Sequence, residues 1–329
     1  MLLKWVPAIH HLFPSCNLPF HQCPALSLHA HNLAGAILME QTSISIGGIP
    51  IQINLPDYST CLEDSYLPFR ISSTLSDIVW HIHPEAISRD FSSTRKSSEL
   101  PRNWKTVQRD GKKGFFLPWE VGDISPCKRA LMENNCSRGD IWIERQKLEN
   151  ISFPLYPLDL LLCSHLLLHR EGMIIHAAAV KINDEAFLFP AASGSGKSTW
   201  ADLAHKLSSW SVLGEDKIIL KKSGADYMIF GTPWNHRQKF QVAESATLRG
   251  IFFLHHSSEN QIKQIKKFLS IQEILQQAFM PFNDRDELDQ AVSIIEDVIR
   301  RVPTYSFGFQ PDQSALDYFQ SFIKKVSGQ

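Results

Sequence analysis

Glycine is scarce in this chain, at 16 of 329 residues, which excludes collagen-like and glycine-rich low-complexity sequences. An excess of charge of one sign is lacking as well, because 33 Lys and Arg residues stand against 34 Asp and Glu residues, a formal net charge of −1. Without a strong field of either sign, we expect neither a nucleic-acid partner nor a membrane-surface partner. The most apolar stretch, residues 158–168, is too short to cross a bilayer.

The six cysteines form no C-x-x-C pair and show no spacing typical of a zinc site. Ordinary reduced thiols are therefore expected. The first residues also lack the unbroken apolar stretch of a signal peptide, because Pro7, His10 and Pro14 interrupt it. Together these features favour a cytoplasmic protein.

The length of the chain favours about two domains, and the sequence patterns divide it into three segments. Residues 1–38 show neither helical nor strand periodicity, which predicts an irregular or mobile arm. The first patterned segment follows Met39, so one hypothesis is that translation starts there. Residues 39–155 are predicted to form a mostly β region, for which position suggests a role in substrate recognition. Residues 156–329 are predicted to form an α/β domain.

Alternating apolar residues and turn signals predict the individual elements. Hairpins are expected around Gly47-Gly48 and over 104–119, turning at Asp110-Gly111. Further strands are expected at 78–82, 141–144, 173–180, 186–189, 211–213, 217–221, 227–230, 248–254 and 304–308. Helices are expected at 157–170, ended by Gly172, at 197–208, at 270–279 with a Ser270…Glu273 capping box, at 288–302 and at 313–324.

The sequence of residues 191–199, Ala-Ala-Ser-Gly-Ser-Gly-Lys-Ser-Thr, lies between a predicted strand and a predicted helix. The glycines allow backbone N–H groups to turn toward phosphate oxygens, and the start of the helix adds partial positive charge. Lys197 can reach the β- and γ-phosphates of a nucleotide, while the Ser198 hydroxyl can ligate Mg²⁺. The segment therefore predicts a site for ATP and Mg²⁺ formed by Ser193, Gly194, Ser195, Gly196, Lys197, Ser198 and Thr199. The alternative is a Ser/Gly-rich loop that caps a helix.

Ala191 departs from this phosphate-loop pattern, which begins with glycine. If the position requires a positive φ angle, alanine adds about 1 kcal/mol of strain. Whether Ala191 impairs nucleotide binding stays open at this point.

An acidic pair, Glu215-Asp216, follows about twenty residues later between two predicted strands. Near a phosphate loop, one carboxylate can hold Mg²⁺ while the other accepts the proton of an attacking hydroxyl. An isolated Glu-Asp pair would instead be read as a solvated turn.

These motifs occur in an order that resembles a known family. A histidine-led strand at His176, the phosphate loop and Glu215-Asp216 together resemble the C-terminal domain of HPr kinase/phosphorylase. The segment Gly231-Thr232-Pro233-Trp234 is similar to a loop of HPr-kinase-related proteins. The resemblance covers about residues 157–325 and is strongest over 173–235. It implies a fold related to phosphoenolpyruvate carboxykinase, in which a mixed sheet carries the loop.

The resemblance also implies roles for individual residues. Lys197 would bind phosphate, and Ser198 and Asp216 would hold the metal. Glu215 occupies the position of the family's proton acceptor, with one methylene more than the family's Asp, so which carboxylate is the base stays open. His176 matches the family's strand histidine and joins Lys197, Glu215 and Asp216 as a catalytic candidate. Residues 156–329 would then be an ATP-binding catalytic domain.

The implied activity is an ATP- and Mg-dependent kinase acting on a hydroxyl of a protein, a peptide or a small molecule. The family's Glu-x-Arg-Gly-Leu-Gly stretch is missing, with Thr247-Leu248-Arg249-Gly250 as a faint echo, so HPr itself is not the expected acceptor. The alternatives are a degenerate nucleotide-binding partner protein and a phosphoenolpyruvate carboxykinase-type enzyme. ATP versus GTP preference and homo-oligomer formation stay open.

Other candidate residues carry weaker signals. Arg237 and Lys239, just after the Trp234 loop, could neutralise phosphate charge or remain solvated. His81 and His83 share one face of a predicted strand, yet no third metal ligand is evident nearby. His255-His256, at a strand end, raises the same question.

Overall fold

A computed structural model describes residues 40–55, 61–72, 76–84, 104–109, 111–118, 126–143, 152–153, 156–235, 237–281 and 284–327. The predictions for residues 1–38, for a start at Met39 and for Asp110 lie outside these residues. Within them, no helix is long and apolar enough to cross a membrane. Cys136 and Cys163 are free and buried.

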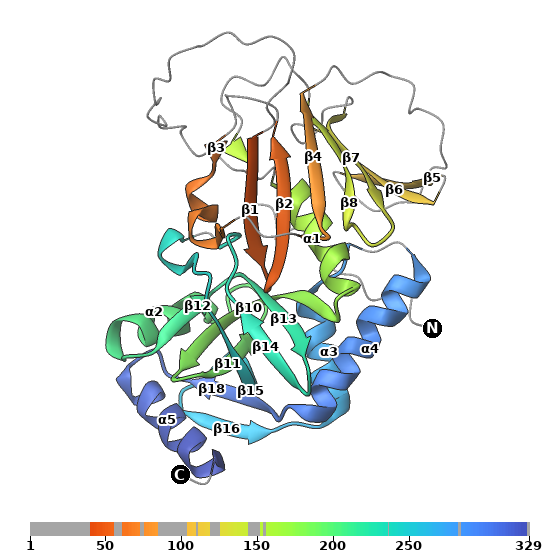
Figure 1. Cartoon of the computed structure of the whole chain (residues 1–329). Coiled ribbons are helices and arrows are strands. Elements are labelled where there is room, and N and C mark those ends of the chain that lie inside the picture. Colours follow the sequence, from red (N-terminus) through yellow and green to blue (C-terminus); the bar gives the residue numbers. More distant parts are fainter. Residues whose placement is uncertain are drawn as a thin grey trace, which may run out of the picture. The chain divides into compact units, whose positions relative to one another are not determined.

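The N-terminal part of the chain builds a seven-stranded mixed sheet in the order β1-β2-β4-β8-β7-β6-β5 (Figure 1). Its strands are β1 (Glu40–Ile46), β2 (Ile49–Leu55), β4 (Val79–Pro84), β5 (Lys105–Arg109), β6 (Lys112–Pro118), β7 (Pro126–Glu133) and β8 (Arg138–Ile143). β4 pairs in parallel with β2 and with β8, and the other pairs are antiparallel. A short 3-10 helix, η2 (Asp64–Phe69), and the strand pair β3 (Cys61–Leu62) and β9 (Ser152–Phe153) accompany it. The predicted hairpin at Gly47-Gly48 is confirmed, with φ angles of 60° and 72° that glycine adopts without strain.

The C-terminal part builds a nine-stranded mixed sheet along the path β11-β10-β13-β14-β15-β18-β16, with β12 and β17 paired to β10. Its strands are β10 (Gly172–Ile182), β11 (Glu185–Pro190), β12 (Ser211–Gly214), β13 (Lys217–Ser223), β14 (Asp226–Phe230), β15 (Ser245–His256), β16 (Gln261–Gln264), β17 (Ala278–Phe279) and β18 (Thr304–Phe309). Because β11 also pairs in parallel with β15, strands β10, β11, β13, β14 and β15 form a closed ring of pairings. The predicted α/β class, with mixed sheets and a β-rich N-terminal region, is confirmed.

Five α-helices belong to this C-terminal part, and four of them cover two sides of its sheet (Figure 1). They are α1 (Leu158–Leu168), α2 (Lys197–Leu207), α3 (Lys267–Gln277), α4 (Arg285–Arg301) and α5 (Gln313–Ser327). Alternate residues of β10 enter different cores, since Ile175 and Ala177 join the core of α3 and α4, and Ala178 and Val180 join that of α2 and α5. Burial on both faces explains why this strand reads as a continuous apolar run.

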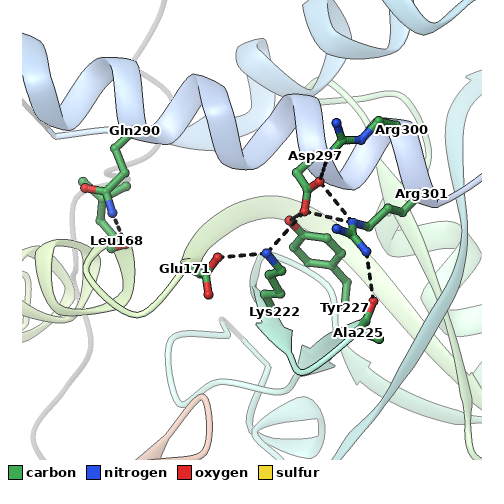
Figure 2. Close-up of polar contacts among 9 residues, drawn as sticks. All are labelled: Leu168, Glu171, Lys222, Ala225, Tyr227, Gln290, Asp297, Arg300 and Arg301. Carbon is green, nitrogen blue, oxygen red and sulfur yellow. Dashed lines mark hydrogen bonds and ion pairs between the residues drawn. The ribbon is translucent and has the colours of Figure 1, made fainter.

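Polar contacts hold α4 against the β13–β14 hairpin and the turn before β10 (Figure 2). The Asp297 carboxylate accepts a hydrogen bond of 2.9 Å from the Tyr227 hydroxyl and lies 3.6 Å from the Lys222 ammonium. Lys222 also pairs with Glu171 at 3.0 Å, and Gln290 donates to the Leu168 carbonyl at 2.9 Å. These contacts fix α4 along the hairpin.

Two predicted helix ends are wrong in detail. Glu171, and not Gly172, takes the left-handed conformation after α1, with φ of 54°. Gly172 instead begins β10, where a Cβ would lie 2.9 Å from Cγ of Lys221. The Ser270…Glu273 capping box does not form, because α3 begins one turn earlier and buries Ser270, whose hydroxyl contacts that of Thr304 at 2.7 Å.

Candidate functional site

The predicted phosphate loop connects β11 to the start of α2. Gly194 and Gly196 have φ angles of 81° and 99°, conformations in which an L side chain is strained. At Gly196 a Cβ would also lie 2.9 Å from Cζ of Phe309, whereas at Gly194 it would meet open space. Ser193, Ser198 and Thr199 are exposed. The loop therefore presents a helix start, with its free N–H groups, toward solvent, which is the arrangement that anions favour.

Ala191 carries no positive φ angle and is buried. The strain that alanine would suffer in a left-handed conformation is therefore absent. Its carbonyl oxygen instead accepts a hydrogen bond of 2.6 Å from the Lys197 ammonium.

Lys197 lies over its own loop. Its ammonium donates to the Ala191 carbonyl and, at 2.9 Å, to the Ala192 carbonyl, and the residue is 7% exposed. Burial lowers its pKa to about 8, although the nearby Asp216 carboxylate acts in the opposite direction. A partly desolvated cation at this position is suited to pair with an anion that enters the loop.

Tight packing holds α2 in place below the loop. Trp200, fully buried on its first turn, lies with its ring centroid 5.0 Å from Phe189, 5.2 Å from Phe307 and 5.4 Å from Phe319. Truncating a buried tryptophan to alanine typically costs about 3–5 kcal/mol. The orientation of the start of α2 is thereby set by β11, β18 and α5.

The strand ends bring further residues to the loop. β11, β15 and β18 run parallel, so their carboxyl ends meet at one edge of the sheet. At this edge Nε2 of His256 lies 2.7 Å from the Gly194 carbonyl oxygen. Thus one member of the His255-His256 pair contacts the loop, and Phe309 packs beneath it.

Glu215 and Asp216 form a buried bend between β12 and β13. Both backbone N–H groups donate to Oδ1 of Asn235, at 2.9 and 3.2 Å. Asn235 is held in turn by its donation to the Thr232 carbonyl at 2.8 Å. The similarity of Gly231–Trp234 to a family loop indicated this segment, but it ends at Trp234 and did not identify Asn235 as a functional residue.

Each carboxylate of the bend has a cationic partner. Arg237 donates to Glu215 through Nε and Nη2, and Lys217 donates to Oδ2 of Asp216 at 2.6 Å. Nε2 of His176, on β10, lies 3.5 Å from Oδ1 of Asp216. Burial lowers the pKa of His176 to about 4, and the positive charge of Lys197 adds to this effect. The imidazole is therefore neutral at physiological pH.

A buried hydrogen-bond group lies behind the bend. Oδ2 of Asp159, on the first turn of α1, accepts from Nε1 of Trp234 at 2.9 Å and from the Tyr66 hydroxyl. No side chain or backbone group of the described residues meets the hydrogen-bond criteria for the buried Oδ1 of Asp159, and desolvation raises the pKa of this carboxyl. Asp159 stands out in the sequence as the one carboxylate of an apolar stretch, but nothing there connects it to Trp234 or Tyr66.

The residues fit a magnesium ion of the kind that shares its ligands with phosphate. Among the described residues, no group of three or more His, Cys, Asp and Glu side chains could hold a metal by itself. Mg²⁺ typically takes one or two protein oxygens and completes its shell with phosphate and water. The exposed Ser198 hydroxyl and the Asp216 carboxylate offer such oxygens. His81 and His83 instead contact Asn54 at 3.1 Å and Asp140 at 2.7 Å.

Comparison with known proteins finds similarity to a family model and to solved structures. A family model described as SynChlorMet cassette protein ScmC matches residues 159–310, a little under half of the chain. Among curated proteins, none matches the chain. Among solved structures, the Hpr(Ser) kinase/phosphatase from Coxiella burnetii is similar at 10% identity and a TM-score of 0.25, covering 47% of this chain and 94% of that one. Because this likeness is low, the fold is described from the sheet topology, and the function is argued from the geometry of the site.

Proposed function

We propose that this protein is an ATP- and Mg-dependent kinase that transfers the γ-phosphoryl group to a hydroxyl of a protein, a peptide or a small molecule. The observation that carries the proposal is the meeting of three features at one sheet edge. The phosphate loop has two left-handed glycines, Lys197 is buried at its base, and the acidic bend lies close enough for Asp216 to act on the pKa of Lys197. The order of these motifs resembles that of HPr kinase/phosphorylase.

The roles follow from where the side chains lie. The N–H groups at the start of α2 and the Lys197 ammonium would hold the β- and γ-phosphates. When bound by Ser198 and Asp216, Mg²⁺ would neutralise phosphate charge. His176, neutral and beside Asp216, would keep that carboxylate oriented. Attraction for the nucleotide is local, because the chain as a whole has a net charge of only −1.

The transfer step balances with the groups at hand. The acceptor hydroxyl oxygen forms a bond to the γ-phosphorus while the bond from the γ-phosphorus to the β,γ-bridging oxygen breaks, and its electron pair leaves with ADP. The hydroxyl proton passes to a carboxylate of the bend. We assign this role to Glu215, because it stands where the resembled family has its proton acceptor, whereas Asp216, whose charge acts on Lys197, is assigned to Mg²⁺.

The acceptor would be recognised in part by the β-rich region before residue 155, and the reaction would take place in the cytoplasm. HPr is not proposed as the acceptor, because the Glu-x-Arg-Gly-Leu-Gly stretch is missing.

The direct test is incubation of the full chain with γ-labelled ATP, Mg²⁺ and a lysate of its host, followed by mass spectrometry of labelled species. Lys197→Ala should abolish the label on the acceptor. Lys206→Ala, an exposed lysine of the same helix, is the matched control and should leave labelling unchanged. Equal labelling by wild type and Lys197→Ala would refute the assignment.

A second candidate, a nucleotide-binding partner protein without transferase activity, is favoured by one observation. Both carboxylates of the bend are already ion-paired, Glu215 with Arg237 and Asp216 with Lys217, so neither is free to take a proton. Tight binding of ATP with no labelled product from any candidate acceptor would support this function over the first.

A further inference from the structure

Arg237 joins the acidic bend to the helix that follows the phosphate loop. Its guanidinium donates through Nε and Nη2 to Glu215, and through Nη1 to both carboxylate oxygens of Asp202 at 2.7 Å each. Nη2 also lies 3.4 Å from the backbone carbonyl of Ser198, the residue next to Lys197. The guanidinium carbon lies 4.8 Å from the ring centre of Phe240. One arginine thus contacts the bend, the helix and the edge of the loop.

The charges around Arg237 make it a shared cation. Glu215 is almost fully buried, with a side chain 5% exposed, whereas Asp202 is 31% exposed and also contacts Lys239 at 3.1 Å. Burial raises the pKa of Asp202, but hydrogen bonds from Arg237 and Lys239 lower it overall. Asp202 therefore keeps a second cation if Arg237 leaves, while Arg237 is the one cation among the described residues that pairs with Glu215.

We propose that Arg237 senses the γ-phosphate: with the site empty it is held by Glu215 and Asp202, and a bound triphosphate draws it away, which releases Glu215. This inference rests on the proposed function, because it requires that a nucleotide binds the loop.

Two physical arguments support the exchange. Arg pairs with phosphate through two parallel N–H groups, and a triphosphate carries more negative charge than the Asp202 carboxylate, which Lys239 also contacts. Once Arg237 has left, Glu215 is a buried carboxylate without its cation, which favours its protonation and so makes it a better proton acceptor. Binding of the triphosphate would thereby switch on the base.

The measured quantity is the triphosphate preference, defined as the affinity for a non-hydrolysable ATP analogue with Mg²⁺ divided by the affinity for ADP with Mg²⁺. Calorimetry on the full chain gives both affinities. Arg237→Gln should lower the preference about 10- to 100-fold by weakening binding of the analogue, with ADP affinity changed less than twofold. Lys239→Gln makes the same charge change beside the same Asp202 and should keep the preference within twofold.

Two further variants keep the test open if Arg237→Gln fails to fold. Arg237→Lys retains the charge but cannot bridge both carboxylates, and it should lower the preference several-fold. Glu215→Gln removes the main anchor of Arg237 and should raise the preference, but it should have no such effect when combined with Arg237→Lys.

The outcomes separate the two proposals. A preference that stays within twofold in the Arg237 variants, or that falls equally in Lys239→Gln, overturns the sensing role while nucleotide binding stands. Failure of the folded wild-type chain to bind either nucleotide overturns both proposals.

Discussion

Replacing Lys197 by Met should stabilise the protein while removing its function. Methionine keeps most of the apolar stem of lysine but has no ammonium. In the native chain Lys197 is 7% exposed at the base of the phosphate loop, where two carbonyl oxygens of the described residues accept from its ammonium. A cation in this environment is costly unless an anion is bound.

The magnitude follows from the pKa. A fall from 10.5 to about 8 corresponds to about 3 kcal/mol against the charged form, at about 1.4 kcal/mol per pKa unit. Loss of the two hydrogen bonds that the ammonium donates destabilises the variant by about 1 kcal/mol each. Partial solvation reduces the first contribution further. We therefore expect Lys197→Met to raise the free energy of unfolding by up to about 1 kcal/mol at pH 7 in the absence of nucleotide.

The stability difference between Lys197→Met and wild type should change with pH. Because the folded pKa lies below the unfolded one, the penalty is fully present below pH 8 and fades as pH rises from 8 to 10.5. The stability gap between variant and wild type should therefore narrow, and then reverse, between pH 7 and pH 10.5. Urea denaturation at both pH values measures it, and calorimetry should show ATP binding weakened at least about 100-fold.

The control is Lys206→Met, on the exposed side of the same helix, which should leave stability and ATP binding within experimental error. A Lys197→Met protein that is less stable than wild type by more than about 1 kcal/mol, or that binds ATP as tightly, would refute the reasoning. A less stable variant would mean that Lys197 stabilises the loop in the absence of nucleotide.

Three further predictions concern the described geometry. Glu287→Gln leaves the buried Lys113 ammonium without its carboxylate partner and should cost about 3–5 kcal/mol of stability in urea; a loss below about 1 kcal/mol would contradict this. Gly196→Ala should abolish nucleotide binding in calorimetry, because its φ is 99° and its Cβ would lie 2.9 Å from Cζ of Phe309. Gly194→Ala has the strained φ but open space for a Cβ, and should cost only about 1 kcal/mol of stability. Because the folded pKa of His176 is about 4, wild type should lose up to about 3 kcal/mol of unfolding free energy relative to His176→Gln as pH falls from 6.5 to 4. Urea titrations in which the stabilities of the two proteins change with pH in parallel would contradict this.

Local signals in the sequence were sufficient for much of the fold. The glycine pairs that turn hairpins require positive φ angles, so Gly47-Gly48 marks its turn without tertiary information. The apolar run of β10 indicates a strand buried on both faces. The phosphate loop and α2 are continuous in sequence, so their residue pattern could be recognised without tertiary information. The division into three segments stays a prediction.

The contacts of the candidate site were harder to predict, because they join residues far apart in the chain. Arg237 contacts Asp202 and Glu215 across 35 and 22 residues, and no periodicity relates these positions. In the sequence Asn235 is one polar residue of a loop, and nothing there predicts that its side chain accepts from the backbone of Glu215 and Asp216. β16 was missed because it is a short edge strand whose residues are mostly exposed, so it lacks the apolar alternation that marks a strand.

The position of the acidic bend depends on both parts of the chain. Asn235 holds the bend through two backbone N–H groups, and its neighbour Trp234 is fixed by Asp159. Asp159 is fixed in turn by Tyr66, which belongs to η2 in the β-rich region. A movement of η2 that broke the Tyr66 contact would remove one donor from a buried carboxylate that also holds Trp234, at a cost of about 1–3 kcal/mol. The β-rich region therefore contributes to the geometry of the bend itself, in addition to any role in recognising the acceptor.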